Sequence, residues 1–230
     1  MNNSIFRHLG VYGGLYSILC FGTGFLLSNW MPPFSPTLSA LELAALYQDN
    51  YQLLLLGAVL MMLSTFFIIP CFAVVVLLIR RVENGWGIPS MIVLISSSAA
   101  VINICLSGIF WAVAAFRPDR NPDVNQVLYD LGFLFFFGAI PLFLLIFAII
   151  AYAALSIGED DEAIFPRWFG YLNILLVIVL IPGVFTFFFK TGPLAWDGLI
   201  TFWIALPPFT ATFFAFSFGL KNGVKILYAK

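Results

Sequence analysis

The stretch LGFLFFFGAIPLFLLIFAIIAYAALSI, residues 131–157, decides the fold, because its 27 residues include no charged side chain. A transmembrane helix needs about 20 mostly apolar residues, so this segment is long enough to cross a bilayer. Asp130 precedes the stretch and the acidic run GEDDE follows it. A helix of this length exceeds a hydrocarbon core of about 30 Å, and tilt or protruding ends would absorb the excess.

Five more apolar stretches follow the same pattern, and none of the 10 Lys/Arg or 11 Asp/Glu residues falls inside any of the six. A charge at mid-bilayer costs at least about 2.5 kcal/mol, which favours six spans over five or seven. The sequence therefore predicts an all-α polytopic membrane protein, a single-domain six-transmembrane-helix bundle. The predicted spans are 10–29, 53–79, 91–116, 131–157, 171–189 and 199–220.

Composition excludes other classes of protein. The chain is 62% hydrophobic and 9% charged, whereas soluble domains are about 45–50% apolar and about 25% charged. A soluble domain, a disordered chain and a nucleic-acid binder are therefore excluded. The first apolar stretch is too long for a signal peptide and no A-x-A site follows it, so we expect a retained helix. All three cysteines lie inside spans, so we expect no disulfide between loops.

The basic residues of the loops predict the orientation. Because cytoplasmic loops carry an excess of Lys and Arg, the richer side is predicted to be cytoplasmic and to hold both termini. That side carries Arg7, Arg80, Arg81, Arg167, Lys221, Lys225 and Lys230. The other side carries Arg117, Arg120 and Lys190.

The longest outer loop contains a predicted short helix over residues 39–50. The prolines of WMPPFSP, residues 30–36, cannot all be helical. Ser39 and Glu42 then have the spacing of a capping box, which starts a helix. We interpret this segment as an interfacial helix, either a structured cap or a lid over an outer-facing cavity.

Prolines interrupt four predicted spans, at Pro70, Pro141, Pro182 and Pro207–Pro208. Proline removes a backbone hydrogen bond and bends a helix. The bent helices either enclose a cavity or hinge, or are ordinary bends of a membrane bundle.

Phenylalanine, which occurs 27 times, forms two stripes at helical spacing. Such stripes either pack helices and face lipid or line a pocket for a lipid, quinone or carotenoid. The stripes are Phe136, Phe143 and Phe147 in the fourth span, and Phe202, Phe209, Phe213 and Phe216 in the sixth.

The third span is rich in small residues, and the spacing of Ser96 with Ala100 and of Gly108 with Ala112 favours close helix contacts. We therefore expect this span at the centre of the bundle. Asn103 and Asn173 are amides at membrane depth that need partners. They are predicted either to join helices or to bind a ligand.

Catalytic and metal chemistry is poorly supplied. The only histidine, His8, precedes the first span, and no acid or base lies at membrane depth. Haem, copper, di-iron and zinc sites need more ligands than these. The GEDDE run lacks the second acidic motif of membrane prenyl-transfer enzymes. We therefore expect no cofactor, no metal and no catalytic residue, and we disfavour an enzyme.

Charged residues gather at the predicted outer ends of the spans. Arg117 and Lys190 follow spans, and Asp130 and Asp197 precede spans. The charge of each therefore interacts favourably with the dipole of the adjacent helix. With Trp196 they are candidates for a ligand rim or a partner surface, beyond capping. On the predicted inner side, Arg167 and Trp168 suit the headgroup level, as membrane anchors or in headgroup recognition.

Three motifs, FRPDRNPD…YDLG, FPRWFGYLN and FFKTGPLAWDGL, lie in this order within residues 110–205. In these motifs the chain resembles a group of uncharacterised bacterial multi-pass membrane proteins. The resemblance implies a bacterial plasma membrane and carries no activity or functional residue.

Three classes of function remain. The first is a non-catalytic membrane subunit or scaffold in a homo-oligomer or larger complex. The second is a binder or conduit for an apolar or amphipathic molecule or lipid. The third, an enzyme, is the least supported.

Overall fold

The chain folds into an all-α bundle with six helical spans, which confirms the predicted fold class. In the computed structural model the described residues are 4–156 and 164–228, and no strand occurs among them. Six helical segments of this part of the chain are long and apolar enough to cross a membrane. The lipid bilayer is therefore the environment of this protein.

The first three spans are regular helices: α1 (Ser4–Leu27), α2 (Ala40–Val82) and α3 (Ile88–Phe116). With 43 residues, α2 is about twice as long as a membrane span requires. Its backbone leaves helical geometry at Asn50, where φ is −130°. The predicted short helix is therefore continuous with the second span across a kink. Ser39 and Glu42 form the predicted capping box at its start.

Bare glycine backbones hold these three helices together. A side chain at Gly24 of α1 would lie 2.7 Å from the Gly57 carbonyl oxygen of α2. A side chain at Gly108 of α3 would lie 2.6 Å from Met62 and 3.3 Å from the Ala58 carbonyl oxygen, both on α2. The small-residue face of α3 is therefore covered within the chain, as close helix packing in membranes requires.

The other three spans are interrupted. The fourth breaks at Ala139, the fifth changes from an α-helix to a 3₁₀-helix after Leu180, and the sixth begins as a π-helix that ends at Ile204. A proline follows each interruption within two or three residues. The elements are α4 (Pro122–Gly138), α5 (Ile140–Ser156), α6 (Arg167–Leu180), η1 (Ile181–Phe188), η2 (Leu199–Ile204), α7 (Leu206–Gly219) and α8 (Lys221–Tyr228).

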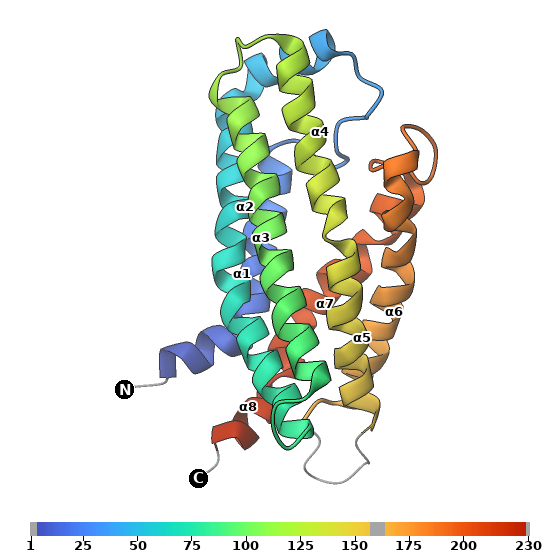
Figure 1. The fold of residues 1–230 in the computed structure, drawn as a ribbon. Coiled ribbons are helices and arrows are strands. Elements are labelled where there is room, and N and C mark those ends of the chain that lie inside the picture. Colours follow the sequence, from blue (N-terminus) through green and yellow to red (C-terminus); the bar gives the residue numbers. More distant parts are fainter. Residues whose placement is uncertain (1–3, 157–163, 229–230) are drawn as a thin grey trace.

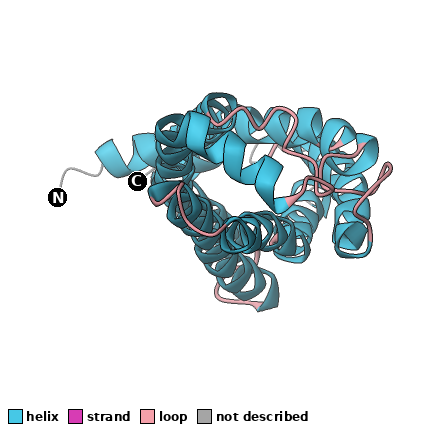
Figure 2. Cartoon of the chain, turned by 90° about the horizontal axis from the view of Figure 1, so that it is seen from above, coloured by secondary structure: helices cyan, strands magenta, loops and turns pink. Residues whose placement is uncertain are grey.

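Pro70 differs from these prolines, because α2 continues through it as an α-helix. Figure 1 shows both termini at one end of the bundle, which we call the terminal end. The opposite end, which we call the cap end, holds the loop between α1 and α2 and the start of α4. Viewed from the cap end, the helices surround the bundle axis, as Figure 2 shows, and α1 contacts both α2 and α7.

Candidate functional site

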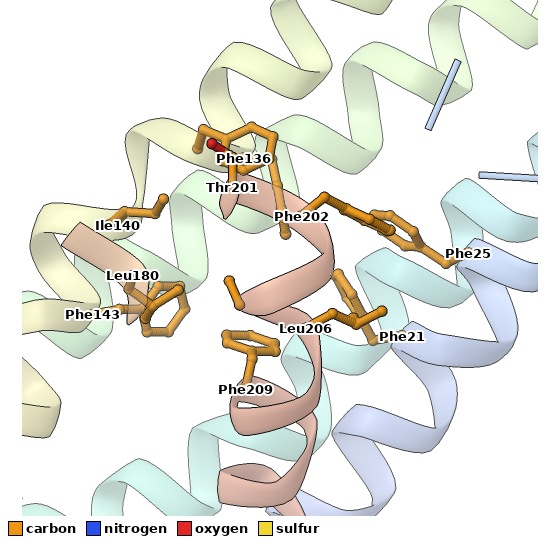
Figure 3. A pocket seen from close by; sticks show the side chains of 12 residues that line it. Phe21, Phe25, Phe136, Ile140, Phe143, Leu180, Thr201, Phe202, Leu206 and Phe209 are labelled. Carbon is orange, nitrogen blue, oxygen red and sulfur yellow. The ribbon is translucent and has the colours of Figure 1, made fainter. Parts of the chain in front are cut away.

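The three interruptions meet around one cavity. Phe137 and Ile140 flank the α4–α5 break, Leu180 ends α6, and Ala205 separates η2 from α7; all four line this cavity. Its volume is about 60 Å³. Five α-helices and η2 contribute to its lining, and Figure 3 shows how the labelled side chains surround the space. The lining residues are Phe21, Phe25, Phe136, Phe137, Ile140, Phe143, Leu180, Thr201, Phe202, Ala205, Leu206 and Phe209.

A second cavity of about 30 Å³ adjoins the first. Phe21, Phe136, Phe143 and Phe209 line both cavities, and we call these four residues the Phe partition. Their ring centroids lie 5.7 Å apart for Phe21 and Phe136, 6.4 Å for Phe21 and Phe209, and 6.1 Å for Phe143 and Phe209. Each ring comes from a different helix, so the partition depends on how α1, α4, α5 and α7 pack.

The cavity walls are apolar and uncharged. The only hydroxyl in the first cavity, that of Thr201, donates a hydrogen bond of 3.2 Å to the Leu194 carbonyl. In the second cavity, Ser64 and Thr65 donate to carbonyls of their own helix over 2.6 Å. These hydroxyls are already satisfied, and a buried charge would have no partner. The site is therefore suited to a neutral, apolar occupant.

An aromatic cluster closes the cavity toward the cap end. Phe25, in the cavity wall, lies 5.8 Å from Trp30 and 6.3 Å from Trp111 between ring centroids. Trp30 and Trp111 lie 4.6 Å apart, and both are fully buried. We call this cluster the aromatic cap. Its members are Trp30, Phe34, Tyr47, Trp111, Tyr129, Phe133 and Trp196.

One backbone carbonyl ties the aromatic cap to the loop between α1 and α2. The Phe34 carbonyl oxygen accepts a hydrogen bond of 3.0 Å from the Tyr129 hydroxyl and one of 2.9 Å from Trp196 Nε1. These donors lie 95 and 162 residues along the chain from Phe34. Nearby, the Gln126 side chain donates 2.9 Å to the Leu38 carbonyl. The loop is therefore fastened to α4 and to the segment before η2.

Asn103 and Asn173 do not line either cavity. The Asn173 side-chain amide donates 2.7 Å to the Phe169 carbonyl of its own helix, and its oxygen is buried without a partner. The Asn103 side-chain oxygen is likewise buried without a partner. A side chain at Gly138, where α4 ends, would lie 4.0 Å from Asn103 Nδ2. Asn103 therefore faces the α4–α5 break from behind the cavity wall.

The predicted charged residues of the cap end are partly brought together. Lys190 lies within electrostatic range of Asp130, and Asp130 and Asp197 lie within range of Tyr129. No ion pair within 4 Å joins any charged residues in ranges 4–156 and 164–228. Arg117 is exposed and forms the C-cap of α3. Of this predicted group, Trp196 alone belongs to the aromatic cap.

Arg167 and Trp168 lie at the opposite end, in the first turn of α6. Both are exposed. They are therefore separated from the cavity by the length of α6. The acidic run GEDDE, residues 158–162, lies outside the described residues.

Several residues of the site were not predicted. Phe21 and Phe25 are spaced by four along α1, a helical signal like that of the two predicted stripes. Tyr129 belongs to a motif that was quoted only for the resemblance, and Phe34 lies in the proline-rich outer loop, where a backbone carbonyl carries no sequence signal. Leu180 and Thr201 are ordinary span residues, and only the positions of the breaks bring them into the wall.

Comparison with known protein families, curated proteins and solved structures finds no match. Within the described part of the chain, no three His, Cys, Asp or Glu side chains are placed to hold a metal ion. The function must therefore be inferred from the cavity and its surroundings.

Proposed function

We propose that this protein binds or conducts a neutral apolar or amphipathic molecule, such as a lipid or quinone, in the cavity between the interrupted helices. One observation carries the proposal: all three interruptions meet at this charge-free space. Near the prolines of these spans the backbone stays in the helical region but changes its hydrogen-bond pattern, and membrane helices keep such changes where neighbouring groups satisfy the freed backbone. Discontinuous helices also form the midplane binding sites of many transporters.

Buried donors in the aromatic cap favour an amphipathic ligand. The side-chain donors of Trp30, Tyr47 and Trp111 are buried and have no hydrogen-bond acceptor. Each such group carries a desolvation penalty of about 1–3 kcal/mol. A ligand with an uncharged oxygen, such as a carbonyl or ether, would relieve this penalty while its apolar part occupies the cavity. Because the cavity is small, entry requires the helices to separate at their breaks.

Photolabelling with a long-chain fatty alcohol that carries a terminal diazirine tests this proposal. The full chain in nanodiscs of neutral lipid is labelled, digested and mapped by mass spectrometry. We expect saturable labelling of Phe143, Leu206 and Phe209 that an excess of the unlabelled alcohol prevents. Labelling of lipid-facing positions alone, without competition, would contradict the proposal.

Two tryptophan substitutions on α7 form a matched pair for this experiment. Leu206→Trp fills the cavity, so we expect it to abolish the saturable labelling. Phe214 lies on the same helix, is 39% exposed and lines neither cavity. We therefore expect Phe214→Trp to label like the wild type. Equal labelling of the two variants would count against the cavity as the binding site.

A membrane-complex subunit is the second candidate function. A groove of about 390 Å³ between α5 and α6 supports it. Ala148, Ala151 and Ser156 lie in this groove beside Ile174 and Ile178. Small residues let a partner helix approach closely. Native mass spectrometry of protein extracted in mild detergent from its own cells separates the two candidates, since a reproducible partner protein or homo-oligomer supports the subunit and a discrete small molecule supports the binder.

The bacterial plasma membrane, with both termini in the cytoplasm, is part of the proposal. Its support is the excess of Lys and Arg on the side of the termini. Cysteine labelling with an impermeant maleimide at either end of the bundle tests the orientation.

A further inference from the structure

A groove of about 340 Å³ lies at the terminal end, between the start of α6 and α8. We propose that it binds the phosphate of an anionic phospholipid, a site separate from the cavity and independent of the proposed function. The phosphate would lie between Lys221 and Lys225, and the acyl chains would run along Trp168 and Phe218. The full lining is Pro166, Trp168, Phe218, Lys221, Asn222 and Lys225.

The two lysines form a like-charged pair on one helix face. Lys221 and Lys225 are four residues apart in α8, a spacing at which like charges destabilise a helix. No described carboxylate lies within 4 Å of either ammonium group. Instead, the Lys221 ammonium lies 5.1 Å from the centroid of the Phe218 ring and 5.6 Å from that of Tyr12. A bound anion would turn the repulsion into attraction.

The floor of the groove selects a lipid rather than a soluble phosphate. Trp168 is 47% exposed and Phe218 is 64% exposed. Because α6 and α7 cross the bilayer, these rings face the acyl chains near the helix ends, where Trp favours the headgroup level. Lysine side chains at helix ends extend toward the same level. Basic pockets between helices at the membrane surface are known to bind anionic headgroups.

Native mass spectrometry of the full chain in neutral detergent measures lipid retention. Wild-type protein is offered phosphatidylglycerol and phosphatidylcholine at equal concentration, and we expect it to retain phosphatidylglycerol preferentially. We expect K221Q/K225Q to lose this preference, by about fivefold for each lysine. K221R/K225R keeps both charges and should retain the preference. Lys190→Gln, at the cap end, is the matched control and should behave like the wild type.

Tryptophan fluorescence gives a readout that needs no lysine substitution. Brominated phosphatidylglycerol should quench Trp168 more than brominated phosphatidylcholine does, and Trp168→Phe should remove the difference. Equal retention of the two lipids by the wild type would overturn the proposal, as would unchanged retention in K221Q/K225Q. If an equal concentration of glycerol 3-phosphate displaces the lipid, the groove is a site for soluble phosphates and the lipid proposal is overturned.

Discussion

Apart from the kink of α2 at Asn50, the half of the bundle formed by α1, α2 and α3 is regular, whereas α4–α5, α6–η1 and η2–α7 are all interrupted. Both halves contain prolines within their spans, so proline alone does not explain the difference. In the regular half, a side chain at Gly10 would lie 3.6 Å from the Pro70 carbonyl oxygen. The backbone of α1 therefore lies directly against the turn that contains Pro70. Tight packing of this kind holds α2 helical across its missing hydrogen bond.

In the interrupted half, the three interruptions border the first cavity, whose wall is completed by Phe21 and Phe25 of α1. Pro141 and Pro207 are exposed, whereas Pro70 is half-buried. The helices therefore change geometry near these prolines, and the changes fall at one level because each borders the same space. The helix that packs against a proline therefore decides whether that proline interrupts its membrane span.

The largest expected effect is that of Phe209→Ala, which removes one ring of the Phe partition in the interrupted half. Removing a core phenylalanine costs about 3 kcal/mol or more, and this ring separates the two cavities. We expect a loss of about 3 kcal/mol in the free energy of unfolding, measured by denaturant titration in detergent. Phe214→Ala on the same helix should cost less than about 1 kcal/mol. Similar losses for the two variants would mean that the partition adds nothing to packing.

Gly13→Ala tests the regular half. The added methyl group would overlap the Phe67 carbonyl of α2. Overpacking costs about 1–3 kcal/mol, so we expect a loss of about 2 kcal/mol by the same titration. Gly22→Ala is the control on the same helix, because no atom lies within 4 Å of its added methyl group. It should leave stability unchanged or raised; destabilisation by both variants would show that the glycines serve helix geometry rather than close approach.

The aromatic cap joins the two halves, and Tyr129→Phe and Trp196→Phe test this junction. Each removes one hydrogen bond to the Phe34 carbonyl, worth about 1 kcal/mol. After either change the Phe34 carbonyl keeps one hydrogen-bond donor. We therefore expect the double variant to lose more free energy of unfolding than the sum of the two single losses. Hydrogen exchange of the loop amides between α1 and α2 should accelerate in step. If the two losses in the free energy of unfolding are strictly additive, water replaces the missing side-chain donors at the Phe34 carbonyl.

Asn103→Leu should have the smallest effect. The Asn103 side-chain oxygen is buried without a partner, so an apolar side chain of similar size removes an unmet acceptor. We expect the stability to stay within about 1 kcal/mol of the wild type and saturable photolabelling to persist. A loss of labelling with intact stability would instead assign Asn103 a direct role in ligand binding.

The sequence predicted many residues of the site as a pattern but did not show where in the bundle they meet. Phe136, Phe143, Phe202 and Phe209 were predicted to form stripes that either line a pocket or pack helices, and these four residues line the first cavity. For the amides of Asn103 and Asn173, the sequence could not decide between joining helices and binding a ligand. Whether an amide faces a cavity or its own helix depends on helix rotation, and Asn173 bonds to the Phe169 carbonyl.

The sequence by itself determined the membrane-helix bundle, because 62% apolar residues with no charge inside the six stretches leave burial in lipid as the only stable solution. It also determined the start of α2, because Ser39 and Glu42 cap it through local hydrogen bonds. Only the tertiary structure decided which prolines interrupt their helices and where the phenylalanine stripes meet. Those outcomes depend on which backbone packs against each proline, and such contacts join residues far apart in the chain.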